Sequence, residues 1–503
     1  MVNHGVSRGC EACKKRRKKC DEARPACKRC VKAHRTCPGY LDEGALIFRH
    51  FEPPKIAYTS PVRWWSPDVP DTELEESAID MFIAEFVVEP ADRQKSRGFL
   101  DGMQILLNSV DPGSGLALAA KLVVLASIGN RTGRRSLLER MERQYVSLLR
   151  TYHKSLSMEE DNVSIENLYT AVLLGLYEII VTNNSTPSKH TAHVRGVCAI
   201  LAGGHSPVDS KTGVRMYQMG NRLFRQSPVV LEAKCVLCAP IAHDSLQNLD
   251  ATLVKFGNLF YQANELLARE SPSFEELLQL EENAIALEED FVSWGDFYSA
   301  TWLPAQAGEV LEATARTSGC AYCHSGPVHS YSDYYVAATW NTFRKSQLTH
   351  IDLLVRLARR LSHEAVILDL EKRARKLVAD IVASIPYHLA YDLGEYLRLI
   401  ETGAPSIPPN RPIGGLLLLH PLYAAARCSV VPVASRMYLS ECLSWIGQDM
   451  GIGQATQLAE SARLGVAGGD RATRALELPF QLPFQEMSEG HILIWAGMLL
   501  QPA

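Results

Sequence analysis

The chain has 503 residues, of which 47% are hydrophobic and 21% are charged, and its mean hydropathy is -0.07. This composition excludes a disordered tail and a collagen-like fibre, and the length favours more than one folding unit. No apolar run reaches the eighteen or so residues of a membrane-spanning helix, because the longest candidate, residues 116–128, is short and contains Lys121.

The first nine residues contain no apolar segment of a secretory signal, so we expect a soluble protein in a reducing, intracellular compartment. Disulfide frameworks are not expected there, and the thirteen cysteines need another explanation. The net charge of -4 is unevenly distributed: residues 1–40 hold twelve Lys and Arg against three Asp and Glu, a net of +9, and the remainder is at -13. This asymmetry indicates a module that binds a polyanion, although a solvated basic face or a nuclear-import signal would explain the basic residues alone.

Six of the cysteines lie within residues 10–37 and form two units of the same spacing. In each unit two residues separate the first cysteine from the second, and six separate the second from the third. The units comprise Cys10, Cys13 and Cys20, followed by Cys27, Cys30 and Cys37.

Structural zinc takes four ligands in a tetrahedron, so six thiolates hold two zinc ions only if two sulfurs are shared. The repeat allows three equivalent bridging pairs, and the spacing does not choose among them. They are Cys10 with Cys27, Cys13 with Cys30, and Cys20 with Cys37. Because about forty residues are too few for a sufficient hydrophobic core, we expect the metal to supply the folding energy of this segment.

The segment resembles the fungal binuclear zinc cluster transcription factors. The likeness lies in the cysteine spacing, the basic stretch Lys14–Lys19, the Cys20-Asp21 step, Pro25 before Cys27, and the Gly39-Tyr40 exit. It implies that the first and fourth cysteines bridge two zinc ions, with Cys10, Cys13, Cys20 and Cys27 on one ion and Cys27, Cys30, Cys37 and Cys10 on the other. It further implies a nuclear transcription factor that regulates RNA polymerase II genes, with control of a pathway of secondary metabolism as a finer implication.

The basic stretch Lys14–Lys19 follows the second cysteine. Phosphate contacts supply salt-sensitive affinity, and arginine pairs with guanine in the major groove, so a basic helix favours a G-rich site. The resemblance implies that the first helix contacts a CGG-type triplet through Arg16 and Arg17, the third and fourth residues after Cys13. The remaining candidate DNA contacts are Lys14, Lys15, Lys18, Lys19, Lys28 and Arg29.

Residues 41–75 contain five prolines, which exclude a continuous helix. No heptad pattern of a coiled coil follows the cysteines, so monomeric binding and dimerisation through the body both stay open. We expect three parts: a zinc cluster DNA-binding domain at 1–40, a Pro-rich linker at 41–71, and an all-α regulatory domain at 72–503.

The body shows helical spacing of apolar residues, and a capping box of Thr72 and Glu75 predicts where its first helix begins. Further helices are predicted over 135–157, 165–182, 246–268, 273–291, 331–362 and 365–395, with Pro/Gly-rich breaks at 203–213, 303–330 and 403–415. The predicted fold class is therefore mostly α. Stretches 168–180, 339–354 and 436–464 resemble the fungus-specific regulatory domain that follows such clusters, which implies an all-α regulatory unit.

The body contains no P-loop, dinucleotide fingerprint, zinc-protease motif or nucleophile elbow, so no enzyme is expected. Cys235 and Cys238 could join Cys320 and Cys323 in a further zinc site, but buried free thiols are the favoured interpretation. Residues 273–291 mix seven acidic residues with apolar ones, as activation segments do. The helical spacing and a capping box of Ser273 and Glu276 favour a folded amphipathic helix instead.

The predicted partners are double-stranded DNA and, through the helical body, the transcription machinery or coregulators; no membrane is expected. Two alternatives to an activator stay open. One is a DNA-binding repressor without an activation function, and the other is a helical body that senses a small ligand.

Overall fold

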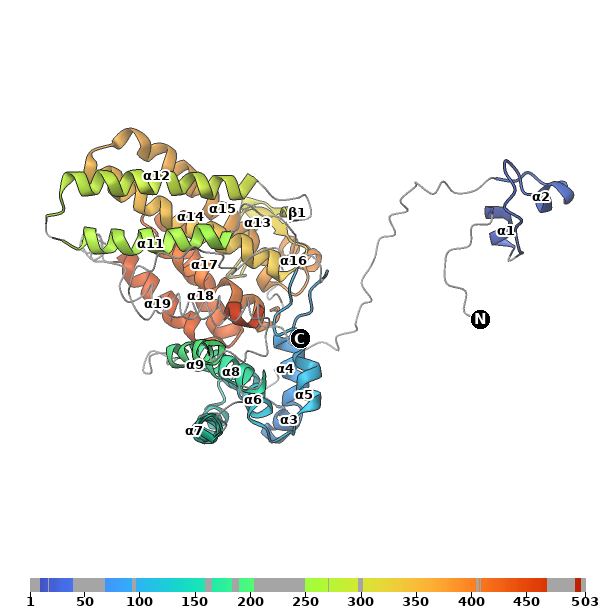
Figure 1. Ribbon diagram of the computed structural model, residues 1–503, viewed down its shortest axis with the longest axis horizontal. Helices are drawn as coiled ribbons and strands as arrows, with labels where there is room; N and C mark the ends of the chain where they lie inside the picture. The colour runs from blue at the N-terminus through green and yellow to red at the C-terminus, as the bar shows by residue number, and fades with distance from the viewer. Residues whose placement is uncertain are drawn as a thin grey trace. The chain divides into compact units, whose positions relative to one another are not determined.

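The computed structural model describes residues 10–16, 18–38, 68–92, 96–158, 165–182, 190–202, 249–269, 271–296, 302–403, 407, 409–467 and 494–498. These residues fall into two compact units, one within Met1–Pro61 and one within Val62–Ala503 (Figure 1). Within the described ranges, no helix combines the length and apolarity that crossing a membrane requires. The predicted linker at 41–71 lies outside them except for its last four residues.

The small unit contains two five-residue helices, α1 (Glu11–Lys15) and α2 (Lys28–Lys32), which are offset by seventeen residues. The same offset recurs in the backbone. Cys13 N–H donates to Cys10 C=O as Cys30 N–H donates to Cys27 C=O, each at 3.0 Å. The sequence repeat is thus also a structural repeat.

The first part of the large unit is a helical layer built around α6 (Gly115–Thr132), which is buried along most of its length. Ser114 caps its N-terminus by accepting from Ala117 N–H at 3.2 Å, and Gly133 ends it in the left-handed region. The packed neighbours of α6 include α4, α7 and α8. The helices of this layer are α3 (Asp71–Glu76), α4 (Ala78–Phe86), α5 (Met103–Ser109), α6, α7 (Arg135–Met158), α8 (Ile165–Val181) and α9 (His190–Ala202).

The second part centres on α14, a 28-residue helix that is buried along most of its length. It packs against α12, α15 and α17, and the C-terminal helices α17, α18 and α19 pack on one another (Figure 1). The helices here are α11 (Leu249–Leu267), α12 (Phe274–Asp296), α13 (Glu312–Thr317), α14 (Tyr334–Leu361), the 3-10 turn η2 (Glu364–Val366), α15 (Ile367–Leu389), α16 (Leu393–Glu401), α17 (Pro412–Arg427), α18 (Val433–Asp449) and α19 (Gly453–Ala467).

One antiparallel hairpin interrupts the helices of the described residues. Its strands β1 (Ala305–Val310) and β2 (Gly326–Ser330) pair from Ala305 opposite Ser330 to Val310 opposite Gly326, with an irregularity between Gln306 and Gly308. The hairpin lies inside the break predicted at 303–330, where proline and glycine density indicated an absence of helix. The same range also contains the short helix α13, which the sequence did not predict.

The turn between α18 and α19 joins the two parts of the body. Gly451 has a φ of +70°, and a Cβ there would lie 2.2 Å from Ser127 C=O, so only glycine fits this approach. Asn130 Nδ2 donates to Ile180 C=O at 2.7 Å and to Gly451 C=O at 3.2 Å. These bonds attach the C-terminal helices to α6 and α8.

The predicted helical fold is confirmed, and helices α7, α8, α11, α12, α14 and α15 begin within three residues of the predicted starts. The capping box of Thr72 and Glu75 was wrong. Helix α3 begins at Asp71, Pro70 supplies no side-chain cap, and Glu75 instead pairs with Arg140 Nε at 2.9 Å. The Glu75 carboxylate therefore binds Arg140, which is distant in sequence, and does not cap the helix N-terminus as the local pattern predicted.

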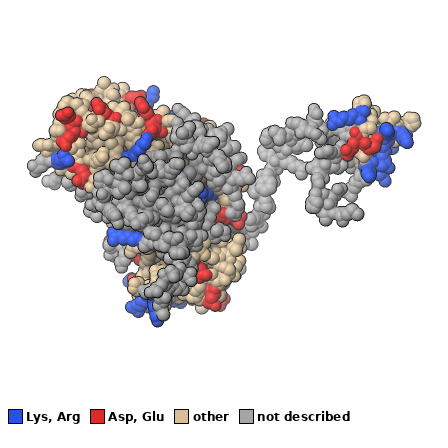
Figure 2. Space-filling model, in the orientation of Figure 1, with Lys and Arg blue, Asp and Glu red and all other residues tan. Residues whose placement is uncertain are grey.

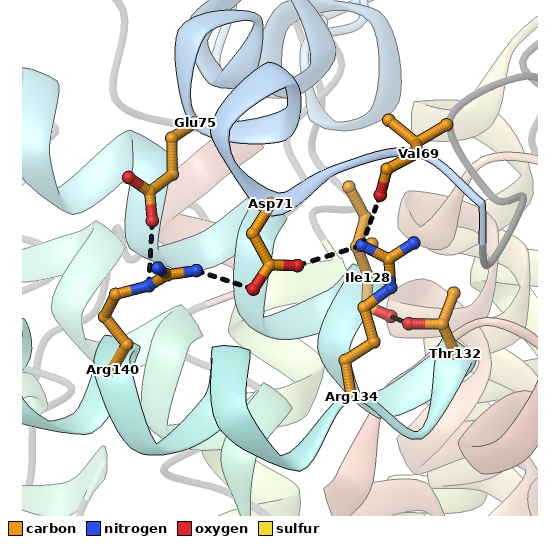
Figure 3. A network of polar contacts seen from close by, with 7 residues as sticks. All are labelled: Val69, Asp71, Glu75, Ile128, Thr132, Arg134 and Arg140. Carbon is orange, nitrogen blue, oxygen red and sulfur yellow. Dashed lines mark hydrogen bonds and ion pairs between the residues drawn. The ribbon is translucent and has the colours of Figure 1, made fainter.

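The start of the large unit is fixed by a polar network around Asp71 (Figure 3). One Asp71 carboxylate oxygen accepts from Arg134 Nη1 at 2.9 Å, and the other accepts from Arg140 Nη2 at 2.7 Å. Arg134 Nη1 also donates to Val69 C=O at 2.7 Å. Two arginines from the α6–α7 region thus converge on the first residue of α3.

A second polar network joins α9 to α7 and α8. Tyr145 O–H donates to Glu178 Oε1 at 2.6 Å, and the phenol oxygen lies 2.8 Å from His193 Nε2. Burial lowers the pKa of His193 to about 4. The imidazole is therefore a neutral packing and hydrogen-bonding group.

Candidate metal centre and nucleic-acid interface

The two short helices of the small unit position its cysteines. Cys10 directly precedes α1 and Cys13 lies within it, while Cys27 is the N-cap of α2 and Cys30 lies within that helix. Cys27 Sγ accepts from Cys30 N–H at 3.3 Å. The remaining two, Cys20 and Cys37, complete the set from extended segments that follow each helix.

The six sulfur atoms form two groups of four. In each group all sulfurs lie within 4.8 Å of one another, one group comprising Cys10, Cys13, Cys20 and Cys27 and the other Cys10, Cys27, Cys30 and Cys37. Cys10 and Cys27 occur in both groups. No other group of three or more potential metal ligands occurs in the part of the chain that the structure describes.

The sulfur separations fit zinc. Cys10 Sγ lies 3.7 Å from Cys27 Sγ and 3.8 Å from Cys30 Sγ, and Cys13 Sγ lies 3.8 Å from Cys27 Sγ. A zinc tetrahedron with Zn–S bonds of about 2.3 Å has edges of about 3.8 Å. A disulfide would need an S–S distance of about 2.05 Å, so these cysteines are free thiols spaced as metal ligands.

The six cysteines can be gathered here as thiolates only beside a cation. Burial is the main cause that raises the pKa of the Cys10 and Cys13 thiols. A hydrogen bond with Cys27, together with burial, raises the pKa of Cys30 to about 12. Gathering six thiolates in this volume therefore requires metal charge to offset theirs.

The small unit has almost no other interior. Its buried residues are the four cysteines Cys10, Cys13, Cys27 and Cys30, and among the described residues the only apolar side chain packed against them that is not a cysteine is Ala12. Such a contact supplies little hydrophobic free energy. The fold of this unit therefore depends on what the sulfurs bind.

The predicted DNA contacts surround this sulfur core. Lys15, Arg16, Lys18, Lys19, Lys28 and Arg29 are exposed, and Figure 2 shows Lys and Arg atoms gathered on the small unit. The side chain of Lys14 and the whole of Arg17 lie outside the described residues.

Two polar contacts tie the second half of the unit to the first. Arg29 Nη1 donates to Lys19 C=O at 2.9 Å, and Lys28 N–H donates to Asp21 Oδ2 at 3.1 Å. Sequence reasoning treated Arg29 only as a DNA contact and Asp21 only as part of a motif. The Cys20-Asp21 step was the available signal, because an aspartate beside a helix N-terminus stabilises its free N–H groups.

The other described cysteines are free thiols: Cys320 and Cys323 are half-buried, and Cys428 and Cys442 are buried. Burial raises the pKa of Cys320 to about 12, so this thiol stays protonated at neutral pH. Cys235 and Cys238 lie outside the described residues.

Known proteins are similar to the N-terminal segment and to most of the chain. Residues 8–43 match the Fungal Zn(2)-Cys(6) binuclear cluster domain. Over 437 residues, 86% of this chain and 98% of the relative, the sequence is 34% identical to the transcription factor dbaG of Emericella nidulans. No solved structure matches the chain.

Proposed function

Since this chain belongs to the fungal Zn(2)-Cys(6) binuclear cluster transcription factors, we propose how its N-terminal unit binds metal and recognises DNA. It is a DNA-binding transcription factor whose cluster domain binds two zinc ions.

Cys10 and Cys27 are the two bridging ligands in this proposal. Cys13 and Cys20 complete the coordination of one zinc, and Cys30 and Cys37 complete that of the other. The observation that supports it is the pair of sulfur groups, which share Cys10 and Cys27 and no other cysteine. Each of the other four cysteines belongs to one group only, as a terminal ligand would. Cys13 and Cys20 are in the first group, and Cys30 and Cys37 are in the second.

Helix α1 enters the major groove and contacts a CGG-type triplet through Arg16 and Arg17. Support comes from Arg16, which is exposed directly after α1, while Cys10 and Cys13 at the same helix are buried toward the sulfur core. A guanidinium can donate to guanine O6 and N7 at once, which is the commonest specific contact to this base.

The remaining basic side chains hold the DNA backbone. Six thiolates and two zinc ions leave residues 1–40 near +7, compared with +9 from the side chains alone. Lys14, Lys15, Lys18, Lys19, Lys28 and Arg29 are the proposed phosphate contacts. Arg29 also donates a hydrogen bond to Lys19 C=O, which restricts the positions from which its guanidinium can contact a phosphate.

A selection from random double-stranded DNA with the full chain, with and without a zinc chelator, tests the whole proposal. Enrichment of CGG-type triplets only in the zinc-loaded sample is expected. Enrichment without zinc, or enrichment of no sequence at all, would contradict it. The number of selected half-sites reports whether one copy or two bind.

The cellular role follows from the same membership. The protein acts in the nucleus on RNA polymerase II genes, as is typical of this family, and on the family likeness we extend this to pathway-specific control of secondary metabolism. Localisation of the tagged full chain, and transcript profiling after deletion of its gene, test these points separately.

A cavity in the body supports a second candidate function, the sensing of a small ligand. It has a volume of about 250 Å³ between α15, α18 and residues 322–328. Its walls are largely apolar, with the His324 and Tyr438 rings 4.8 Å apart at one side. Arg375 adds a cation whose Nη1 lies 4.0 Å from Glu371, close to the limit of an ion pair.

These walls suit a small apolar molecule with one carboxylate. A thermal-shift comparison of the full chain with aryl carboxylates and their neutral amides tests this fit. The carboxylates should stabilise the protein more than the amides do, and Arg375→Gln should remove the difference. Equal shifts in both proteins would exclude Arg375 from ligand binding.

A further inference from the structure

Helix α12 exposes an ordered face to solvent. Three glutamates, each seven residues apart, alternate with three aliphatic residues of the same period, so that successive members lie three or four positions apart. We call this face the α12 stripe; it comprises Glu275, Leu278, Glu282, Ile285, Glu289 and Val292. Spacing of three and four residues places all six along one line of the helix surface.

A separate set of side chains attaches α12 to the body. These side chains are buried where the helix packs on α11 and α14: Leu277, Leu280, Ala284, Leu287, Phe291 and Trp294. Gln347 Nε2 donates to Glu288 at 2.7 Å on this buried side. The core therefore accounts for one apolar face of α12 and is contacted by Leu278 at the edge of the α12 stripe, but it leaves Ile285 and Val292 exposed.

The position of the helix is fixed at its beginning. Glu276 N–H donates to Ser273 Oγ, and Ser273 N–H donates to Glu276 Oε2, each at 3.1 Å, which is the capping box that the sequence predicts. Lys255 on α11 adds an ion pair to Asp290 at 2.7 Å. The α12 stripe is thus presented on a rigid helix.

The aliphatic members of the α12 stripe are exposed to an extent that folding does not explain. Ile285 is 53% exposed and Val292 is 46% exposed, while Leu278 is half-buried. Aliphatic side chains repeating every seven residues form the seam along which a second helix packs. A row of this kind on the surface marks a site of interaction with another protein.

The charge of α12 restricts the partner. The helix has eight acidic residues and no basic ones. Glu275 and Glu289 make no ion pair within the described structure, and Glu282 accepts only from Gln279, at 3.3 Å. Figure 2 shows acidic atoms at the end of the body where Figure 1 places α12. Such a face repels DNA, anionic lipid and a second copy of itself.

We propose that the α12 stripe binds a basic amphipathic helix of another protein. Leu278, Ile285 and Val292 would pack against its aliphatic residues, and the three glutamates would pair with Lys or Arg on either side. This proposal rests on the proposed function, because it assigns the partner the role of a transcriptional coregulator.

Binding is measured by fluorescence anisotropy with the full chain and a labelled synthetic peptide of three heptads, with Leu at the seam positions and Lys or Arg beside them. A scrambled peptide of identical composition is the control. The helical peptide should bind at least about tenfold more tightly than the scrambled one. Equal binding of both would mean unspecific charge attraction and would overturn the proposal.

Variants identify the surface. E275Q/E282Q/E289Q and I285S/V292S should each weaken the peptide about tenfold or more. The charge control E364Q/E401Q/E441Q removes three exposed glutamates outside α12, and the apolar control L368S/L464S replaces two exposed leucines; both should change binding less than twofold. Losses as large in the controls would overturn the assignment to α12.

A reporter assay connects binding to transcription. The full chain is fused to a bacterial DNA-binding domain, so that recruitment does not depend on the zinc cluster. At equal protein abundance, E275Q/E282Q/E289Q should change reporter output at least threefold relative to E364Q/E401Q/E441Q. Unchanged output would overturn the coregulator role, whereas failure of the zinc cluster to select DNA would leave this assay unaffected.

Discussion

Cys10 Sγ and Cys27 Sγ lie 3.7 Å apart, and each belongs to both four-sulfur groups of the small unit. The loss of either sulfur therefore removes a ligand from both groups at once, whereas the loss of any other cysteine in the unit affects one group. This difference lets an experiment distinguish the proposed bridging cysteines from the proposed terminal ones.

The first prediction concerns zinc content. Cys27→Ser should leave well under one zinc per chain, because both tetrahedra lose a ligand, while Cys20→Ser should retain about one. Elemental analysis of the purified full chain measures this. Cys320→Ser, which changes a half-buried thiol of the body, is the matched control and should retain two. A Cys20→Ser variant with the lower zinc content would point to another bridging pair.

Metal removal should affect the two units differently. Because Ala12 is the only described apolar side chain other than cysteine that packs on the sulfur core, a chelator should unfold the small unit and abolish DNA binding. The body has its own extensive apolar core and should keep its thermal transition. Limited proteolysis and circular dichroism measure the two responses. If the chelator also lowered the temperature of the body's thermal transition substantially, the two units would not be independent.

Base contacts and phosphate contacts should differ in their response to DNA sequence. Arg16→Ala should cost about 1–3 kcal/mol on the preferred site and relax discrimination at one base pair, and we expect the same of Arg17→Ala. Lys28→Ala should weaken all sequences alike and lower the salt dependence. Titrations on matched and mismatched duplexes measure both. An equal loss from Arg16→Ala on every duplex would assign Arg16 to the backbone.

The Asp71 network should contribute to the stability of the body. The side chain of Arg134 is only 13% exposed and that of Asp71 28%, so Asp71→Asn should lower the free energy of unfolding by about 1–3 kcal/mol. Glu139→Gln removes an ion pair whose arginine is 91% exposed, and it should cost less than about 0.5 kcal/mol. Urea unfolding compares them. Equal effects would show that burial does not strengthen the network.

Buried histidines should make stability depend on pH. The pKa values of His193 and His350 are lowered to about 4 by burial, below the ordinary value of 6.5. The unfolded chain then binds more protons than the folded chain as the pH falls, so stability decreases between pH 6.5 and about 4. His193→Gln should show a shallower decrease in urea unfolding at stepped pH. An unchanged slope would mean that His193 is protonated in the folded state.

Sequence patterns predicted the features that depend on local spacing. The periods of α7 and α12 were clear because each helix alternates buried and exposed positions, and the capping box of Ser273 and Glu276 formed as expected. The box of Thr72 and Glu75 did not form, because Arg140, 65 residues away from Glu75, binds that carboxylate. The hairpin of β1 and β2 was missed because its stability depends on packing against α15 and α16.

The gathering of the six cysteines could be predicted from the sequence, but the hydrogen bonds between the two halves of the unit could not. Spacing alone indicated six cysteines and a shared pair. The contact of Arg29 with Lys19 C=O depends on how the two halves of the unit face each other, which no local pattern encodes.

The seventeen-residue offset between α1 and α2 relates two stretches of different charge. Shifted by that offset, the six basic residues at 14–19 correspond to Val31, Lys32, Ala33, His34, Arg35 and Thr36. The cysteine spacing is thus duplicated, but the run of six consecutive basic residues occurs in one copy. We therefore expect substitutions at residues 31–36 to change the preferred DNA site less than substitutions at residues 14–19 do.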